Sequence, residues 1–160
     1  MDFRLDVMRS NNLKLSDIQE ASSELELLPG AYNFLQKIRQ NFQVVILSDT
    51  FHEIAKPLME KMGFPLLLCH NLDVVNDEII SYKLRNKKAK KQAIESFQSI
   101  GYRCLAAGDS YNDLQMFEVA DKSFFINAPD KISSSYPEIP SFDNYTDLES
   151  AIVNNSIFKK

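Results

Sequence analysis

The segment Gly108-Asp109-Ser110-Tyr111-Asn112-Asp113 constrains the fold of this chain more than any other. It follows the apolar residues 104–107 and precedes the helix-like residues 114–117, which predicts a buried strand, a glycine turn and a helix. In an open α/β sheet, ligands bind beyond the carboxyl ends of the strands, where a glycine turn lets the backbone approach them. Two carboxylates there, Asp109 and Asp113, are suited to a hard cation such as magnesium. The alternative is an Asx-rich turn that only caps a helix.

A second predicted strand, the short β-branched segment of residues 43–47, leads into Ser48-Asp49-Thr50. The hydroxyl of Ser48 and the neighbouring backbone N–H groups could hold a phosphate oxygen, aided by the N-terminal dipole of a helix predicted over residues 51–62. The alternative is that Ser48 or Asp49 caps that helix. Two predicted strands therefore end in polar clusters.

The third feature is the basic stretch of residues 83–91, which lies between a predicted hairpin and a helix over residues 90–100. Such a run is usually a solvated face. Lys90 is unusual at a helix start, because cations are disfavoured near a helix N-terminus unless an anion is close. A bound phosphoryl group would supply that anion.

In this order, Ser48, Lys90 and Gly108-Asp109-x-x-Asn112-Asp113 resemble motifs two, three and four of the haloacid dehalogenase superfamily of phosphotransferases. The chain is similar above all to its phosphoserine phosphatase branch, and there to the bifunctional phosphoserine phosphatase and homoserine phosphotransferase type. The segments that carry this closer likeness are residues 13–20, 44–51, 63–70, 82–85 and 106–113. The resemblance covers nearly the whole chain.

The resemblance implies an α/β, Rossmann-like haloacid dehalogenase fold with a mostly parallel sheet and a small helical cap. Residues 1–28 would be the remnant of the cap region, and residues 29–160 the phosphatase core. It also implies a Mg2+ cofactor and a small phosphorylated amino acid, phosphoserine or phosphohomoserine, as the substrate. We therefore expect a phosphomonoester hydrolase or phosphotransferase of the serine biosynthesis type.

The same resemblance assigns roles to individual residues. Asp109 and Asp113 would bind Mg2+, and Ser48 and Lys90 would be the catalytic residues that hold the phosphoryl oxygens. The implied substrate-binding residues are Arg4, Ser48, Asp49, Thr50, Lys90 and Asn112. Arg4 matches the arginine that grips the substrate carboxylate, although an arginine on an amphipathic helix is often only a surface residue.

The family's motif one is missing from this sequence, because no Asp-x-Asp or Asp-x-Glu follows an apolar strand. In the family, this motif supplies the aspartate that attacks phosphorus, from a strand that lies between those ending at Ser48 and Asp109. We therefore expect an N-terminally truncated member with little or no activity. Two strand edges without partners would favour self-association. The alternative is a catalytically degenerate module that binds phosphate and Mg2+.

Composition limits the other classes of function. The net charge of −4 gives no sign of nucleic-acid binding. No apolar stretch is long enough to span a membrane, and no signal peptide follows Met1. Cys69 and Cys104 lie in predicted strands and read as reduced, buried thiols, so we expect a cytoplasmic protein.

Local patterns predict the remaining elements. Ser16-x-x-Gln19 is a capping box that would open a helix over residues 16–23. Asn76-Asp77 is the predicted turn of a hairpin, and Gly63 would end the helix over residues 51–62. Thr146 would cap a helix over residues 147–153. The other predictions are helices over residues 1–12 and 31–40, strands over 66–69 and 123–126, and a surface loop over 133–144.

Overall fold

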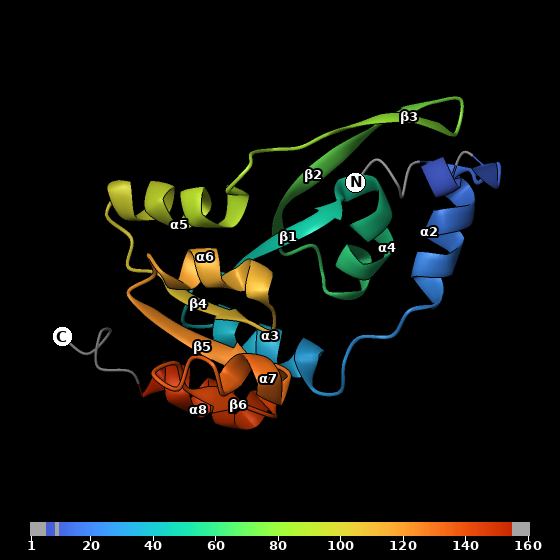
Figure 1. The fold of residues 1–160 in the computed structure, drawn as a ribbon. Coiled ribbons are helices and arrows are strands. Elements are labelled where there is room, and N and C mark those ends of the chain that lie inside the picture. Colours follow the sequence, from blue (N-terminus) through green and yellow to red (C-terminus); the bar gives the residue numbers. More distant parts are fainter. Residues whose placement is uncertain (1–5, 9, 155–160) are drawn as a thin grey trace. The chain divides into compact units, whose positions relative to one another are not determined.

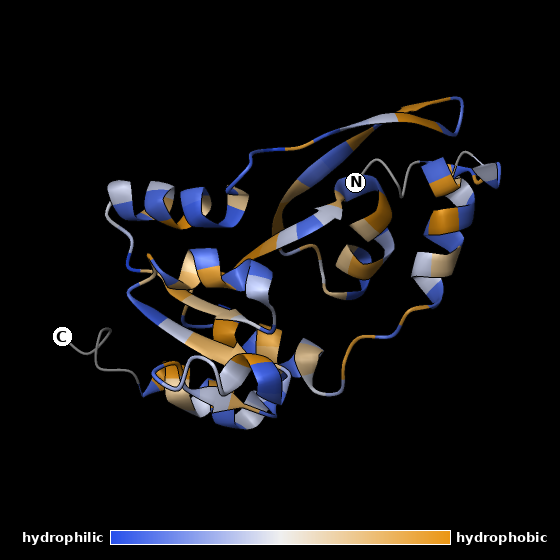
Figure 2. Ribbon diagram, viewed as in Figure 1, coloured by the Kyte–Doolittle hydropathy of each residue, from blue (hydrophilic) through white to orange (hydrophobic). Residues whose placement is uncertain are grey.

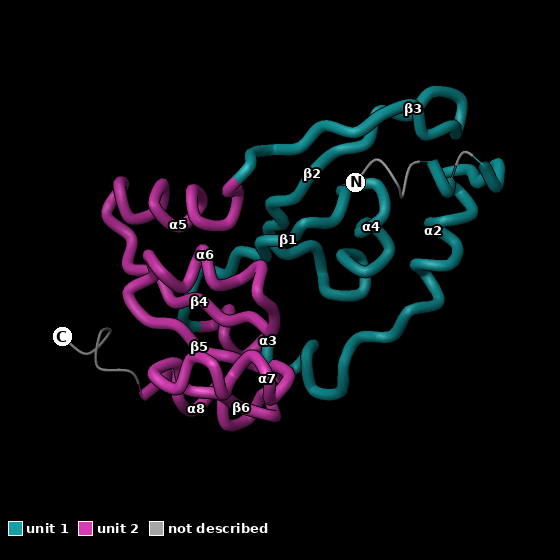
Figure 3. The backbone as a smooth tube through the Cα atoms, viewed as in Figure 1, with its two compact units in different colours: residues 1–35, 41–87 teal, residues 36–40, 88–160 magenta. Residues whose placement is uncertain are grey.

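The computed structural model describes residues 6–8 and 10–154. The chain divides into two compact units (Figure 3): unit 1 contains residues 1–35 and 41–87, and unit 2 contains residues 36–40 and 88–160. The expected division into residues 1–28 and 29–160 stays a prediction. None of the helices in the described ranges is long and apolar enough to cross a membrane.

Unit 1 has a three-stranded sheet in the order β1-β2-β3, with β1 parallel and β3 antiparallel to β2 (Figure 1). Its elements are α2 (Leu15–Glu24), β1 (Val45–Phe51), α4 (His52–Lys61), β2 (Leu66–Val75) and β3 (Glu78–Lys83), while α3 (Ala31–Arg39) runs from unit 1 into unit 2. Residues 6–8 and 10 are also helical. The predicted hairpin is confirmed: Asn76 and Asp77 have φ angles of 48° and 68°, as a two-residue turn requires.

The core of unit 1 lies where α2 and α4 pack against the sheet. One cluster of buried side chains contains Phe51, Leu72 and Ile79. A second contains Ala55, Met59, Leu67 and Cys69. Figure 2 shows that α2 and α4 each alternate hydrophobic and hydrophilic residues, as helices with one buried face do.

Unit 2 has a second three-stranded sheet, in the order β4-β5-β6, in which all strands are parallel. Its elements are α5 (Ala89–Ser99), β4 (Leu105–Gly108), the 3-10 turn η1 (Tyr111–Asp113), α6 (Leu114–Phe117), β5 (Lys122–Ile126), α7 (Asp130–Ser133), β6 (Ser141–Phe142) and α8 (Tyr145–Val153). The helices α6 and α8 pack on this sheet, and α6 also contacts α5. Phe125 of β5 and Leu148 of α8 are fully buried at its centre.

The α/β fold class is confirmed, and several predicted boundaries are wrong. The helix α2 begins at Leu15 rather than at the predicted capping box, because Asp77 binds the backbone N–H and hydroxyl of Ser16 instead. Asn144, not Thr146, caps α8, by accepting from the backbone N–H of Asp147. The predicted loop over residues 133–144 contains the short strand β6, which extends the sheet beside β5.

Among the described residues, β1 is the last strand at one end of its sheet, and β4 holds the same place in the other. Of the polar segments that the sequence singles out, residues 48–50 lie within the last part of β1, and residues 109–113 follow β4. In the usual sheet geometry, the free edge of such a strand carries backbone N–H and C=O groups that can pair with a further strand.

Candidate functional site

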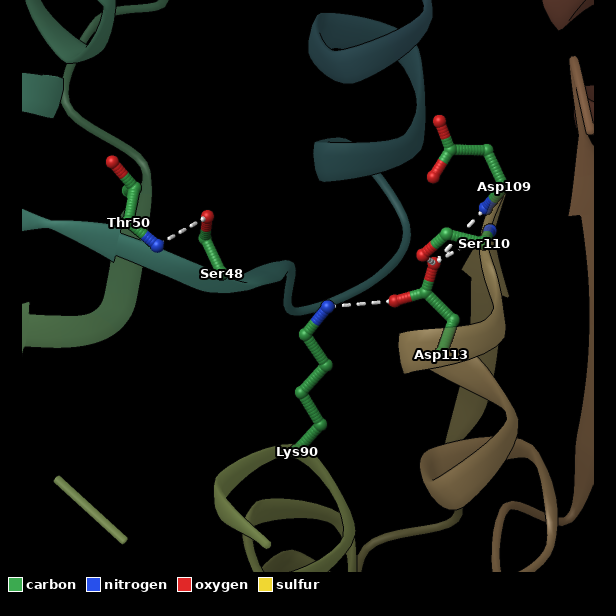
Figure 4. A network of polar contacts seen from close by, with 6 residues as sticks. All are labelled: Ser48, Thr50, Lys90, Asp109, Ser110 and Asp113. Carbon is green, nitrogen blue, oxygen red and sulfur yellow. Dashed lines mark hydrogen bonds and ion pairs between the residues drawn. The ribbon is translucent and has the colours of Figure 1, made fainter. Parts of the chain in front are cut away.

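The end of β4 folds an aspartate back onto its own turn. After Gly108 the chain turns through Asp109 and Ser110 into η1, and this brings the Asp113 carboxylate under the turn. Asp113 Oδ2 accepts hydrogen bonds from the backbone N–H groups of Asp109 and Ser110, both at 3.1 Å, and from the Ser110 hydroxyl at 2.9 Å (Figure 4). Three donors on one oxygen fix the carboxylate in place.

Gly108 makes this close approach possible. A Cβ atom at position 108 would lie 2.5 Å from Asp113 Cγ and 2.7 Å from Asp113 Cβ. Because the Asp113 side chain is short and bound at both oxygens, it has little room to move away. The glycine is therefore required by packing against Asp113.

The other oxygen of Asp113 binds Lys90. Lys90 Nζ lies 2.8 Å from Asp113 Oδ1, and the two side chains are only 13% and 7% exposed (Figure 4). Lys90 is the second residue of α5, whose first turn has no acidic side chain. The sequence led us to expect a bound phosphoryl group as the anion near Lys90; in the structure, the Asp113 carboxylate provides a negative charge there.

Burial alone would raise the pKa of Asp113, because desolvation penalises the charged form. The hydrogen bond and charge of Lys90, together with the hydroxyl and N–H of Ser110, outweigh burial and hold that pKa below its usual value. Asp113 is therefore a carboxylate at neutral pH and keeps Lys90 paired.

Asp109 differs from Asp113 because it is exposed at the surface of the turn, whereas Asp113 is buried. Its charge acts on Tyr145 at the start of α8: burial raises the pKa of Tyr145, and the negative Asp109 raises it further. Asn112, in η1, is also exposed. Of the two aspartates, Asp109 is the one with an accessible carboxylate.

The carboxylates at this turn can be compared with those that the implied Mg2+ would need. No group of three or more His, Cys, Asp or Glu side chains that could hold an ion occurs within residues 6–8 and 10–154. Both oxygens of Asp113 are engaged by protein donors, whereas Asp109 offers an exposed carboxylate. Mg2+ commonly takes only one or two protein carboxylates and completes its shell with water and phosphate oxygens. The chemistry of the turn fits such an ion, and Asp109 is the residue that would hold it.

The segment that contains Ser48 lies in unit 1. The pairing of β1 with β2 shifts register between Leu47 and Phe51, so Ser48, Asp49 and Thr50 lie in an irregular part of the strand. Ser48 Oγ accepts a 3.2 Å hydrogen bond from the backbone N–H of Thr50 (Figure 4). The strand continues to Phe51, and no side chain caps α4. The capping alternative for Ser48 and Asp49 is therefore wrong.

A cavity of about 510 Å³ opens beside this strand in unit 1. Ile46, Ser48 and Thr50 line it from alternate positions of β1, and the rest of its wall comes mainly from apolar side chains of α2 and α4. Ser48 and Thr50 thus face a space large enough for a small molecule, with hydroxyl groups on a largely apolar wall.

The predicted site residues thus fall into two groups. One group, in unit 2, consists of Lys90, Asp109, Asn112 and Asp113. Of these, Asp113 binds both the side chain of Lys90 and the backbone N–H of Asp109, so these three residues meet at one turn. Ser48, Asp49 and Thr50 belong to unit 1, and Arg4 lies outside the described residues. Sequence reasoning missed the roles of Ser110 and Tyr145. The spacing Ser110-x-x-Asp113 is a capping-box pattern and could have revealed the first.

Comparisons with known proteins agree with this geometry. The model of the haloacid dehalogenase-like hydrolase family matches residues 3–121. Phosphoserine phosphatase ThrH of Pseudomonas aeruginosa is 44% identical over 150 residues, which cover 93% of this chain and 73% of that protein. A phosphoserine phosphatase of Pseudomonas syringae pv. tomato is 43% identical over 98% of this chain and 66% of its own length. The chain thus spans about two thirds to three quarters of these relatives.

Solved structures show the same fold. A phosphoserine phosphatase in its apo form aligns with a TM-score of 0.72 and 18% identity, over 89% of this chain and 74% of that one. The phosphoserine phosphatase from T. onnurineus, in complex with NDSB-201, aligns with a TM-score of 0.68 and 21% identity, over 88% and 66%. With its fold and its family match in agreement, this chain belongs to the haloacid dehalogenase-like hydrolases.

Proposed function

We propose that this chain binds and processes the phosphomonoester of a small amino acid, phosphoserine or phosphohomoserine, with Mg2+ as cofactor. The observation that carries the proposal is the largely buried pair of Lys90 and Asp113, whose carboxylate also accepts from the backbone N–H of the exposed Asp109. A fixed cation next to a metal-binding carboxylate is what phosphoryl transfer needs, since its catalysis is mostly positioning and charge neutralisation. The similarity to phosphoserine phosphatases supports the substrate class.

In this proposal, each residue of the turn has a separate task. Asp113 holds Lys90 in one orientation, and Lys90 places its positive charge on the phosphoryl oxygens. Asp109 holds Mg2+, with Asp113 as a further or outer-shell ligand. When bound, the ion neutralises phosphate charge and orients the substrate.

The remaining expected contacts are part of the proposal. Ser48 and Thr50 bind the substrate from the irregular end of β1, together with Asp49. Asn112 hydrogen-bonds to the phosphate or to the water shell of the metal. Arg4 binds the substrate carboxylate, since a guanidinium recognises carboxylates through two parallel hydrogen bonds.

The test is binding of inorganic phosphate, measured calorimetrically with and without Mg2+. Lys90→Met and Asp109→Asn should abolish the Mg2+-dependent binding. The matched control is Lys91→Met, because Lys91 lies in the same helix and forms an ion pair with the exposed Glu118. If Lys90→Met and Lys91→Met bind phosphate equally well, the proposed site is wrong.

A second candidate is a module that binds phosphate and Mg2+ without turnover. The sequence favours it in one respect: no Asp-x-Asp or Asp-x-Glu follows any of its apolar strands, and covalent phosphoryl transfer requires a carboxylate in line with phosphorus. Release of phosphate from phosphoserine, measured beside the binding experiment, separates the two candidates. Binding with release supports the enzyme, and binding without release supports the module.

Two further properties complete the proposal. The edges of β1 and β4 favour self-association, which light scattering would detect as a mass above that of one chain. The two cysteines are free thiols, which fits a reducing compartment such as the cytoplasm.

A further inference from the structure

His70 is one of three polar or charged residues that are buried within the described parts of the chain, and the proposed function does not use it. It lies in β2 at the point where this strand changes partners. His70 pairs with Phe51 of β1, and the next residue, Asn71, pairs with Lys83 of β3. The ring of His70 packs against that of Phe51, with their centroids 6.0 Å apart.

The imidazole binds the chain just after β3. The pairing of β2 with β3 ends at Lys83, and two residues later the backbone N–H of Arg85 donates a 3.0 Å hydrogen bond to His70 Nδ1. The side chain thus continues the hydrogen bonding of the sheet by one step beyond the strand. A ring nitrogen that accepts carries no proton, so this bond requires a neutral imidazole with its proton on Nε2.

The bound segment leads to Lys90. Residues 84–88 are all exposed, and α5 follows them at Ala89, so the anchored amide of Arg85 is five residues before Lys90. We propose that His70 is a positioning residue: its neutral imidazole fixes the connection between β3 and α5 and thereby the approach of Lys90 to a bound phosphate. This inference rests on the proposed function for its effect on phosphate binding.

Protonation would oppose this bond directly, because it places a second N–H against the N–H of Arg85. Two residues of opposite charge, Glu53 and Arg85, lie near this part of β2. Glu53 of α4 accepts from the backbone N–H of Leu72 at 2.9 Å. The charge of Glu53 raises the pKa of the neighbouring Cys69 thiol, and the charge of Arg85 lowers it. The elements that meet here are β1, α4, β2 and β3. Within them and just after β3, the charged or titratable residues are Asp49, His52, Glu53, Lys56, Glu60, Lys61, Cys69, Asp73, Glu78, Tyr82, Lys83 and Arg85.

The first part of the test is the hydrogen bond itself. In nitrogen-15-labelled protein, we expect NMR to detect a scalar coupling between the amide nitrogen of Arg85 and Nδ1 of His70. Lack of this coupling would overturn the inference. The measurement uses the unmodified chain, so it does not depend on the folding of a variant.

The second part is rescue by a conservative variant. His70→Leu removes the acceptor and should weaken Mg2+-dependent phosphate binding about fivefold, the effect of one ordinary hydrogen bond. His70→Asn restores an acceptor and should bind phosphate as the original chain does. Equal affinities of the Leu variant and the original chain would overturn the positioning role.

The role of His70 can be tested even if the proposed function is wrong. If the unmodified chain binds no phosphate, amide hydrogen exchange over residues 86–90 tests whether His70 fixes this segment. Faster exchange in His70→Leu than in His70→Asn supports the positioning role, and equal exchange in the two variants overturns it.

Discussion

The side-chain amide of Gln19 donates a 2.7 Å hydrogen bond to the backbone carbonyl of Glu53. In a regular helix, this carbonyl would accept from the N–H of residue 57, but α4 has Pro57 at that position, and proline has no N–H. Gln19 of α2 therefore supplies the donor that Pro57 removes. Beside it, the hydroxyl of Ser22 donates to the next carbonyl, that of Ile54, at 2.9 Å.

Replacing Gln19 should therefore destabilise unit 1 in a way that depends on Pro57. We expect Gln19→Leu to lower the free energy of unfolding by about 1 kcal/mol, the low end of the cost of leaving a carbonyl without a donor, because this bond is only partly buried. In a Pro57→Ala background, the restored N–H satisfies Glu53, and the loss should be smaller. Urea denaturation of the four proteins measures this, with Gln115→Leu as a control at an exposed glutamine. Equal losses in both backgrounds would contradict it.

Gly108→Ala should disrupt the turn that holds Asp113. The added Cβ would overlap three atoms of the Asp113 side chain, and such overpacking costs roughly 1–3 kcal/mol or more. Gly101→Ala is the matched control, because Gly101 has a φ of 94° but no atom within 4 Å of the added Cβ. Both variants should lose stability by thermal unfolding, but only Gly108→Ala should also lose phosphate binding. Retained binding would show that the Asp113 geometry is not needed.

The sequence predicted those features that neighbouring residues determine. Asn76-Asp77 adopts the expected turn, and Gly63 has the left-handed φ of 74° that ends α4. The prediction failed where a side chain binds a residue that is distant in the sequence. The cap predicted at Ser16 is displaced by Asp77, which is 61 residues away. Asp113, which binds Lys90, is 23 residues away, so the sequence indicated the need for an anion and suggested a phosphoryl group, but it did not identify Asp113.

Asp113→Asn should be strongly destabilising at neutral pH. It removes the negative charge that Asp113 places beside the largely buried Lys90, and removing one partner of a buried ion pair costs roughly 3–5 kcal/mol. The folded-state pKa of Asp113 lies below the ordinary 3.8, so the stabilisation by its charge is present above pH 3.8 and is lost as the pH falls through the folded-state value.

The stability difference between the two proteins, measured by urea denaturation across pH, should therefore be constant near neutrality and shrink only below pH 3.8. A difference that shrinks between pH 7 and pH 5 would show that another group controls the stability of this turn.

Asp109→Asn should lower the pKa of Tyr145. Burial is the main reason that this pKa is raised, and the negative charge of Asp109 is the second, so removing the charge leaves only the effect of burial. An ultraviolet titration of the phenol measures the shift, and Tyr145→Phe identifies the signal among the six tyrosines. An unchanged titration would show that Asp109 does not face Tyr145.

The same phenol reports on the metal. If Asp109 holds Mg2+, the cation cancels the charge that raises the pKa of Tyr145, so adding Mg2+ should lower this pKa as Asp109→Asn does. In the Asp109→Asn variant, Mg2+ should have no further effect. A shift of equal size in both proteins would mean that the ion acts from elsewhere, because a ligand can perturb Tyr145 through Asp109 only where that carboxylate is present.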